Sequence, residues 1–538
     1  MESGCIPFTQ VPQTSALYRD FLYDFAQVAR FYLHNPFEAA SFAAAAKQIA
    51  PEASRWSAVA AVLAEQNRGW GAGADVQENI ARLRDGRTLA VVTGQQVGLF
   101  GGPCYSVYKA LTAIHLAQLL TAAGTPAVPV FWLASEDHDF AEVNHCLLLD
   151  ARDQQLAMKD EASHADGLPV GRVKLGASIE ALRQQVMGLW PRESAAEAEE
   201  LLSGYAPGAS YADAFARLFA RLFAGHGLII LNPAHAELHR LSAPLFRRVV
   251  EEAAPLQAAI VERDRELERA GYHAQVHPRE NATLLFASVN GRRVPLRRRG
   301  SNFQLTGQGE LEPRALLAQL EAEPENFSAN VLLRPVMQDW LLPTVAYVAG
   351  PHEAAYFAQA SVLYERLLGR MPVIVPRTSL TLVPPRVQRL LAKYKLTVAD
   401  CWHAPRHLAT RLAERRLPRA AVRRLERAQA RLEKLLAETG EAAAALDPTL
   451  RGAVETSRRK MAYQLEKIRR KAARARAERE AIIGRHTEVL AHWLYPERDL
   501  QERRVSFLSF VARHGRVLVE RLLGKVKHPC RDHQVVFL

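Results

Sequence analysis

Short apolar runs of strand length alternate with amphipathic stretches of helix length through most of this chain. The runs cover residues 89–93, 128–133, 228–231, 344–348 and 373–375, and most are followed by a stretch long enough for a helix. A strand that returns to the same sheet through a helix lies parallel to its predecessor, which restricts the possible topologies. The sequence therefore predicts an α/β fold built around a parallel sheet.

Two stretches interrupt this alternation. Residues 150–225 are mostly polar and helical in pattern, whereas residues 274–305 hold two strand-like runs around the turn Asn290-Gly291. We interpret both as insertions into the sheet domain. The predicted order is core (1–149), helical insertion (150–225), core (226–273), small β-containing insertion (274–325), core (326–385), helical coiled-coil arm (386–485) and a C-terminal segment that packs on the core (486–538).

The arm has its own helical pattern. Pro418 suits the first turn of a helix that extends to about residue 446, and Asp447-Pro448 interrupts it. A second helix is expected over residues 450–483. The apolar positions that form the two seams are Val422, Leu425, Leu432 and Leu436 in the first helix and Met461, Leu465, Ile468, Ala472 and Ala475 in the second. The pattern predicts an antiparallel hairpin that projects from the body.

Charge is concentrated in the same region. The chain has a net charge of +12, and residues 404–480 alone hold 21 Lys+Arg and 10 Asp+Glu. Few aromatic residues interrupt this basic stretch, so we interpret it as a solvated helix surface and do not expect nucleic acid as a partner.

Composition excludes several classes of protein. No apolar run approaches the roughly 18 residues of a membrane span. The first residues lack a basic stretch followed by an apolar one, so we expect a cytoplasmic protein without a membrane partner. The five cysteines are far apart and form no CxxC pair, which favours reduced thiols over disulfides or a thiolate zinc site.

A glycine-rich turn follows the first predicted strand. Its sequence, T-G-Q-Q-V-G-L-F-G-G-P over residues 93–103, precedes a predicted helix, where backbone N–H groups and the helix N-terminus favour an anion. We interpret this turn as a candidate phosphate site, with a packing turn as the alternative; its candidate residues are Thr93, Gly94, Gln95, Gln96, Gly98, Gly101, Gly102, Tyr105 and Lys109.

Acidic residues and a histidine follow the second predicted strand. Ser135 is followed by Glu136, Asp137, His138 and Asp139, and such a cluster at a strand end needs a cation, an amine or hydrogen-bond donors. We expect His138 to act as a general base on an amine and the three carboxylates to bind Mg²⁺ or an ammonium group. A transition-metal site is disfavoured, because the spacing matches no zinc pattern. A helix cap with solvated acids is the alternative.

Further candidates surround the fourth predicted strand. Gly350 and Glu353 repeat the glycine-to-helix pattern, and Tyr356 follows them in the same helix. Asn330 and Arg334 lie upstream, and the guanidinium could bind a carboxylate of a substrate. An ordinary helix cap and a structural ion pair are the alternatives for Glu353 and Arg334.

Together these segments resemble the BshC family of bacillithiol biosynthesis. The resemblance rests on T-G-Q-Q (93–96), S-E-D-H-D (135–139), R-P-x-x-Q (334–338) and V-A-G-P-x-E (348–353), with L-D-P-T-L (446–450) and L-Q-E-R-R-V (500–505) further along. It implies a Rossmann-like core with two insertions and a coiled-coil arm that forms a homodimer. The implied activity is addition of L-cysteine to the glucosamine amine of glucosaminyl malate, the final step of bacillithiol biosynthesis.

The activation of the carboxylate and the role of Cys104 are inferred from chemistry and from a departure from the family pattern. Joining a carboxylate to an amine in water requires activation, so ATP with Mg²⁺ is the expected cofactor and a cysteinyl adenylate the expected intermediate. Cys104 stands where the family usually has an aliphatic residue, which favours a small core residue over a catalytic thiol. Two other functions stay open: an RNA-binding relative of class I aminoacyl-tRNA synthetases, although the HIGH and KMSKS motifs are absent, and a non-catalytic coiled-coil assembly factor.

Overall fold

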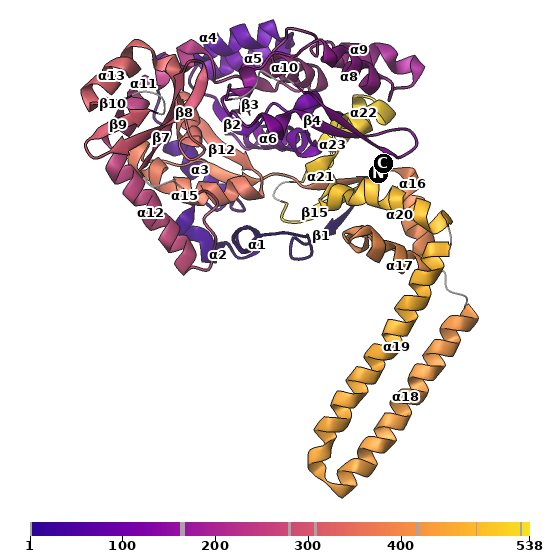
Figure 1. Cartoon of the computed structure of the whole chain (residues 1–538). Coiled ribbons are helices and arrows are strands. Elements are labelled where there is room, and N and C mark those ends of the chain that lie inside the picture. The colour runs from indigo at the N-terminus through magenta and orange to yellow at the C-terminus, as the bar shows by residue number, and fades with distance from the viewer. Residues whose placement is uncertain are drawn as a thin grey trace.

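The computed structural model describes residues 3–161, 167–277, 281–305, 309–415, 419–479, 481–527 and 530–538. It has a body of sheets and helices from which a long two-helix arm projects (Figure 1). Both ends of the chain lie in the body, where β1 (Ser3–Ile6) pairs with β15 (His533–Phe537). None of the described helices combines the length and apolarity that a bilayer crossing requires.

The core is a five-stranded parallel sheet, as the alternating pattern predicts. Its strand order is β13 (Val373–Pro376), β12 (Thr344–Ala349), β2 (Leu89–Gln95), β3 (Ala127–Leu133) and β6 (Ile229–Leu231). Each of the five predicted runs forms one of these strands. Because the connections leave the middle of the sheet in both directions, the carboxyl ends of β12, β2 and β3 face a common crevice.

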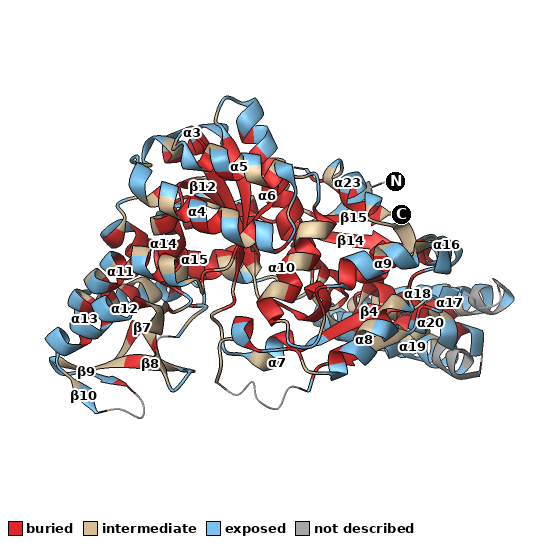
Figure 2. Cartoon of the chain, turned by 90° about the horizontal axis from the view of Figure 1, so that it is seen from above, coloured by how far each residue is buried: buried red, intermediate tan, exposed pale blue. Residues whose placement is uncertain are grey.

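Helices cover both faces of this sheet, which is why its strands are apolar throughout. Along β2, Val91 packs against one group of core residues and Ala90 and Val92 against another, as period-two alternation requires. The helices that lead away from the crevice are α6 (Cys104–Ala122) after β2, α11 (Ala236–Glu251) after β6 and α15 (Pro351–Leu367) after β12. Figure 2 shows the sheet and α6 as the buried centre of the body.

The second insertion is a sheet of its own. The hairpin of β7 (Ala282–Val289) and β8 (Arg292–Arg299) turns at Asn290 and Gly291, both with positive φ as a tight hairpin turn requires. The antiparallel sheet has the order β10-β9-β8-β7-β11, in which the other strands are β9 (Asn302–Leu305), β10 (Glu310–Leu311) and β11 (Phe327–Ala329).

Two sheets differ from the sequence-based expectation. The region 150–225, expected to be mostly helical, also contributes β5 (Gln155–Lys159), which pairs with β4 (His145–Leu149). A small sheet of β1, β15 and β14 (Leu380–Val383) joins the two ends of the chain and was not predicted. Its strands are short and far apart in sequence, so local periodicity cannot reveal their pairing.

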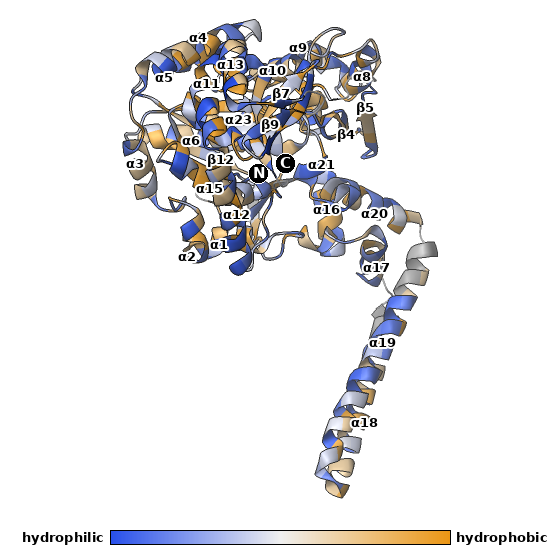
Figure 3. Cartoon of the chain, turned by 60° about the vertical axis from the view of Figure 1, so that its left-hand side comes forward, coloured by the Kyte–Doolittle hydropathy of each residue, from blue (hydrophilic) through white to orange (hydrophobic). Residues whose placement is uncertain are grey.

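The arm is the predicted antiparallel hairpin. It consists of α18 (Arg419–Leu446) and α19 (Arg451–Arg479), joined by a turn in which the Asp447 side chain accepts a hydrogen bond from the Thr449 N–H. The predicted helix start at Pro418 and the side chain of Val422 lie outside the described residues. Figure 3 shows hydrophilic and hydrophobic residues side by side along both helices.

The contact between the arm helices differs in part from the predicted seam. Leu425 and Leu465 line one small depression between α18 and α19, and Leu436 is buried. Met461 and Ile468, however, are 44% and 55% exposed, so they do not form the contact within one chain. Basic residues of α19 pair along their own helix, as Arg458 does with Glu455 and Arg470 with Glu466.

The remaining helices complete the body and the root of the arm. They are α1 (Ala16–Tyr23), α2 (Phe25–Val28), α3 (Ala39–Lys47), α4 (Ala53–Gly69), α5 (Ala74–Arg84), α7 (Phe140–Val143), α8 (Ser178–Met187), α9 (Ala195–Leu202), α10 (Tyr211–Leu222), α12 (Ala253–Arg269), α13 (Pro313–Ala322), α14 (Arg334–Leu341), α16 (Pro385–Tyr394), α17 (Pro405–Arg415), α20 (Ala481–Leu494), α21 (Gln501–Arg504), α22 (Leu508–His514) and α23 (Val517–Leu523).

Candidate active site

A cavity of about 780 Å³ lies at the carboxyl edge of the core sheet. The turns after β2, β3 and β12 form one side of it, and β7 and β8 of the second insertion form the other. The glycine-rich turn and the acid–histidine turn therefore meet at one mouth, which is where open parallel sheets bind ligands. The sequence-predicted residues that line the cavity are Gly94, Gln95, Gln96, Tyr105, Lys109, Glu136, Asp137, His138, Asn330, Arg334, Gly350, Glu353 and Tyr356.

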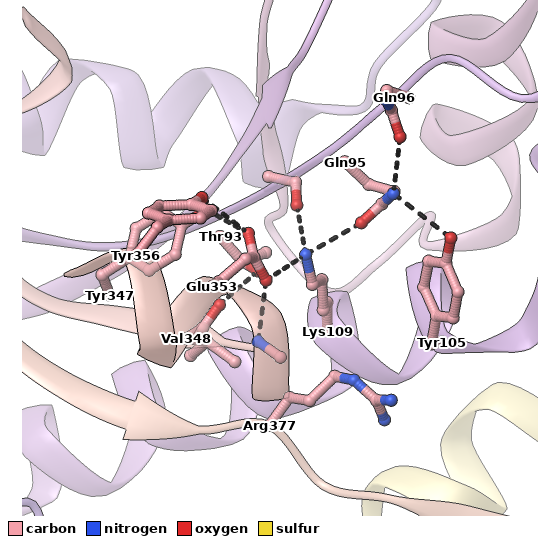
Figure 4. A network of polar contacts seen from close by, with 12 residues as sticks. Thr93, Gln95, Gln96, Tyr105, Lys109, Tyr347, Val348, Glu353, Tyr356 and Arg377 are labelled. Atoms are coloured by element: carbon pink, nitrogen blue, oxygen red, sulfur yellow. Dashed lines mark hydrogen bonds and ion pairs between the residues drawn. The ribbon is translucent and has the colours of Figure 1, made fainter. Parts of the chain in front are cut away.

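Lys109 and Glu353 form a closed network on one side of the cavity (Figure 4). The Nζ of Lys109 lies 2.5 Å from Glu353 Oε2 and donates hydrogen bonds to Gly94 O at 2.7 Å and Gln95 Oε1 at 2.8 Å. Glu353 also accepts bonds from the Gly350 N–H and the Tyr347 hydroxyl. Burial opposes ionisation of this carboxyl, but Lys109 outweighs it and holds the pKa of Glu353 below its usual value.

This network ties β2, α6 and α15 together and leaves Lys109 without a free donor. An ammonium group has three donors, and all three have partners here. Lys109 is therefore a structural ion pair at the floor of the cavity, and the geometry gives no support to its predicted contact with a phosphate.

Arg334 is different, because no described carboxylate lies within ion-pair distance of it. Its guanidinium donates to the hydroxyls of Tyr356 at 3.0 Å and Tyr347 at 3.4 Å and to Gln338 Oε1 at 3.3 Å. These neutral acceptors hold the side chain in place without cancelling its charge. Arg334 can therefore bind an anionic group of a ligand in the cavity.

Gln96 connects the turns after β2 and β3. Its Nε2 donates to Asp137 Oδ2 at 3.1 Å and to Glu142 Oε2 at 2.6 Å. Asp137 also accepts from the backbone N–H of His138 at 2.7 Å. Glu142 is exposed at the rim as a whole, but partial desolvation of its carboxyl, together with the nearby Asp137 and Asp139, raises its pKa. Gln96 thus relieves repulsion between two carboxylates that face the cavity.

His138 lies at the opening of the cavity and has weak partners. Its Nδ1 is 3.7 Å from Asp137 Oδ1 and 3.4 Å from Arg293 Nη1, and 44% of its side chain is exposed. Arg293 comes from β8, where it donates to Ser328 Oγ and Ala329 O and stacks on the ring of Phe286. The imidazole is not fixed by a short bond, so it is free to meet a substrate.

Glu136 has one ion-pair partner among the described residues, a histidine that sequence reasoning missed, and Arg293 and Arg172 act on its charge from further away. The Nε2 of His239 lies 3.1 Å from Glu136 Oε1, in an ion-pair contact, and its Nδ1 lies 2.8 Å from Phe327 O. His239 is in the first turn of α11, and only 2% of its side chain is exposed. A lone histidine on the buried side of an amphipathic helix carries no signal in the sequence beyond that of a core residue.

Other site residues could have been found from the pattern. Arg293 and Arg297 line the cavity from β8, four residues apart on the same face of that strand. Arginines that share one face of a half-buried strand indicate a polar inner face, and this signal points to Arg293 and Arg297. Tyr347 was predicted only as part of a strand.

Six predicted site residues do not line the cavity. Thr93 is buried and donates to Val348 O, and Ser135 is buried and donates to Asn232 Oδ1. Asp139 caps α7 by accepting a bond from the Glu142 N–H, which is the alternative stated for it. The others are the three glycines of the turn, Gly98, Gly101 and Gly102.

These three glycines serve packing. The N–H of Gly101 bonds to Gly98 O and to the Tyr205 hydroxyl, and that of Gly102 bonds to Leu99 O. A Cβ on Gly98 would lie 2.9 Å from the Cα of Gly102. The Cys104 N–H at the start of α6 is also taken, by Val505 O. The donors expected to hold a phosphate are thus already paired, which corrects the phosphate-site interpretation of these glycines.

Cys104 is fully buried, as expected for a core residue. Burial raises the pKa of its thiol, which makes it a poor nucleophile. The described residues contain no group of three or more His, Cys, Asp and Glu side chains that could hold a metal by themselves. Asp137 and Glu142 are the pair of carboxylates that could share a Mg²⁺ with a bound ligand.

A parallel sheet of this order, with a cavity lined by charged and apolar side chains at its carboxyl edge, defines a Rossmann-like protein, and here a coiled-coil arm is attached to it. Residues 1–378 match the family model "Bacillithiol biosynthesis BshC, N-terminal Rossmann-like domain", and residues 380–538 match "Bacillithiol biosynthesis BshC, C-terminal coiled-coil domain". The chain belongs to the BshC family of bacillithiol-biosynthesis enzymes.

Curated relatives agree over the whole chain. The proteins of Koribacter versatilis and Solibacter usitatus are 44% identical over 536 residues and 40% identical over 541 residues, in each case across 100% of both chains. A protein of Salinibacter ruber is 34% identical over 97% of this chain and 96% of its own. All three carry the provisional name of cysteine ligase BshC.

Proposed function

We propose that this protein is the ligase that joins L-cysteine to the glucosamine amine of glucosaminyl malate, as the final step of bacillithiol synthesis. The observation that carries the proposal is the cavity, which is lined both by Arg334, an arginine without a carboxylate partner among the described residues, and by a half-exposed acid–histidine turn. An anionic substrate that also presents an amine has complementary groups at both ends of such a site. The family membership supplies the class of reaction.

The proposed roles follow from the geometry. Arg334 binds a carboxylate of the malate group, and the Tyr356 and Tyr347 hydroxyls hold the guanidinium in position. His138 accepts a proton from the attacking amine, because it is the least constrained base at the opening of the cavity. Asp137 orients the imidazole and stabilises its protonated form.

The chain also offers groups that fit ATP and Mg²⁺. Asp137 and Glu142, held apart by Gln96, would hold the metal, and Arg297 would face the phosphates; within the described ranges Arg297 has no ion-pair partner. ATP would supply the energy to activate the carboxylate of cysteine as an adenylate, which water alone cannot do. The same reasoning makes Arg297, rather than the glycine turn, the proposed phosphate contact.

The test is reconstitution with purified protein. Cysteine, glucosaminyl malate and MgATP should give bacillithiol, AMP and pyrophosphate, detected by mass spectrometry, and omission of the nucleotide should abolish the product. We expect Asp137→Ala and His138→Ala to lose most of the activity, by about 10²–10⁴-fold for the general base. Product formed equally by both variants would remove these residues from the mechanism, and product formed without nucleotide would remove the adenylate.

We further propose that the protein is a cytoplasmic homodimer joined through the arm. Leu435, Met461 and Ile468 are exposed apolar residues on helices that are otherwise strongly charged, and a second copy would cover them. Light scattering should give a dimer mass that falls to the monomer mass in the double variant Met461→Glu and Ile468→Glu. Tyr463→Glu is the matched control, since Tyr463 lies about 200° around α19 from Met461.

A further inference from the structure

The pairing of Glu136 with His239 points to a role that the fold alone does not require. Glu136 follows β3 and lines the cavity with 13% of its side chain exposed. His239 reaches it from α11, and the imidazole is anchored on its other side by the carbonyl of Phe327 in β11. Three elements far apart in sequence thus fix one carboxylate at the wall of the cavity.

The Nδ1 of His239 is hydrogen-bonded to Phe327 O, and its Nε2 lies 3.1 Å from Glu136 Oε1 in an ion-pair contact without hydrogen-bond geometry. Burial acts against a charge on the imidazole, but Glu136 outweighs it and raises the pKa of His239. The same contact holds the pKa of Glu136 below its usual value although the carboxyl is buried. By geometry, Glu136 has one oxygen beside His239, whereas its other oxygen has no hydrogen-bond partner among the described residues.

The other carboxylates of the cavity are less suited to bind an α-ammonium group, and Asp137 and Glu142 are the pair proposed for Mg²⁺. Glu353 accepts bonds at both oxygens from Lys109, Gly350 and Tyr347. Asp137 accepts from Gln96 and from the His138 N–H, and Glu142 is exposed at the rim, where water competes for it.

A carboxylate that is held in place on one side and has a free oxygen on the other can accept a hydrogen bond from an ammonium group. The proposed reaction brings two amines into the cavity: the attacking amine must lose a proton, whereas the α-ammonium of the amino acid keeps its charge throughout. The fixed carboxylate of Glu136 suits the amine that stays charged, and the half-exposed His138 is left to accept the proton of the other.

Building on the proposed function, we infer that Glu136 binds the α-ammonium of the cysteine substrate, and that His239 is a positioning residue that holds this carboxylate toward the cavity. By binding the ammonium group, Glu136 would fix the orientation of the bound cysteine. The carboxylate of cysteine would then point to the side of the cavity where it is activated. Glu136 and His239 together define a subsite for the amino acid at the end of β3. This subsite is separate from the part of the cavity where Arg334 lies.

Calorimetric titration tests the contact of Glu136. Wild type and Glu136→Gln are titrated under reducing conditions with L-cysteine and with 3-mercaptopropionate, which keeps the thiol and carboxylate but lacks the amine; both titrations are done with and without a non-hydrolysable ATP analogue. We expect wild type to prefer cysteine by about tenfold to a hundredfold, the range of a hydrogen-bonded charge pair. Glu136→Gln should bind the two ligands equally and leave the affinity for 3-mercaptopropionate unchanged.

The outcomes separate this inference from the proposed function. A preference for cysteine that persists in Glu136→Gln overturns the inference alone, as does a wild type that makes bacillithiol but binds both ligands equally. A wild type that binds no cysteine and forms no product overturns the proposed function and the inference with it.

His239 is tested by steady-state kinetics. His239→Leu should raise KM for cysteine about tenfold with little change in KM for the amino sugar, and His239→Gln, which keeps a donor near Glu136, should recover most of that loss. His235→Asn is the matched control, because it lies one turn earlier in sequence, caps α11 and keeps its capping function. An unchanged KM for cysteine in His239→Gln and His239→Leu, or loss of stability in its place, overturns the positioning role.

Discussion

Glu353 and Glu136 each follow a strand of the same parallel sheet and each face a buried cation, yet their surroundings differ. Glu353 accepts hydrogen bonds at both oxygens, and its partner Lys109 has used all three donors. Glu136 contacts only His239 among the described residues and keeps one oxygen toward the cavity. The Lys109–Glu353 pair therefore has no hydrogen-bonding capacity left for a ligand, whereas the Glu136–His239 pair has one carboxylate oxygen left for a ligand in the cavity.

The difference teaches how to separate a structural ion pair from a binding group when both line one cavity. Burial, charge and position at a strand end are common to the two glutamates, so none of these features distinguishes them. What distinguishes them is whether the hydrogen-bonding capacity of the group is used up within the fold. A saturated pair stabilises the fold, whereas an unsaturated one has capacity left for a ligand.

The strongest test of this contrast is Lys109→Met. It leaves Glu353 as a buried charge without its counter-ion, which should lower the free energy of unfolding by about 3–5 kcal/mol. Urea titration followed by circular dichroism measures the loss. Glu136→Gln is the comparison variant and should cost far less, because His239 can release its proton. Equal losses in the two variants would contradict the contrast.

His533 is a second buried group whose hydrogen-bonding capacity is used up within the fold. It allows a test of how stability depends on pH. His533 bonds to Ser379 Oγ and Thr381 Oγ1, and burial lowers the pKa of its imidazole to about 4, with Glu502 and Arg377 as the charged neighbours. Below pH ~6.5 the unfolded chain gains a proton that the folded chain excludes, so stability falls as pH drops toward 4.

The total effect should be on the order of 3 kcal/mol between pH 6.5 and pH 4, measured as urea midpoints over a series of pH values. His533→Gln should remove this part of the pH dependence while leaving the dependence that arises from carboxylates. The same slope in wild type and variant would show that His533 titrates normally.

Arg334 sharpens the contrast, because it contacts the closed network but has no carboxylate partner in the described part of the chain. Arg334→Met should raise KM for glucosaminyl malate about ten- to a hundredfold, the range of a charged hydrogen bond, with little loss of stability. The KM of Arg334→Lys for glucosaminyl malate should lie between those of wild type and Arg334→Met, since lysine keeps the charge but loses the bidentate geometry. Arg240→Met, in an exposed ion pair, is the control. Loss of stability without a change in KM would assign Arg334 to the closed network.

The smallest predicted effect concerns two glycines of the same turn. In Gly98→Ala and Gly94→Ala, the added Cβ would lie 2.9 Å from Gly102 Cα and from Trp132 O, respectively. The free energy of unfolding of each variant should fall by about 1–3 kcal/mol through overpacking. Only Gly94 lines the cavity, so only Gly94→Ala should also change KM for a substrate. A changed KM in Gly98→Ala would restore the phosphate interpretation of the turn.

The sequence predicted the framework because its signals are local. The five core strands are apolar runs that need no partner to be recognised, and the hairpin at Asn290-Gly291 follows from turn chemistry alone. It could not predict β1, β14 and β15, whose short runs become a sheet only when the ends of the chain meet. It also misjudged Met461 and Ile468, because periodicity identifies an apolar stripe but not which neighbour covers it.

The features of the candidate site also divide into those that the sequence predicted and those that only the structure revealed. The residue types after each strand were enough to bring Glu136, His138, Arg334 and Glu353 to one cavity, since the carboxyl ends of parallel strands share an edge. Only the tertiary structure decided that Lys109 is saturated, that the N–H groups of Gly101 and Gly102 are paired and that His239 stands behind Glu136. The physical reason is that a strand pattern depends on neighbours in sequence, whereas the capacity of a polar group to bind a ligand depends on every donor and acceptor that the fold brings to it.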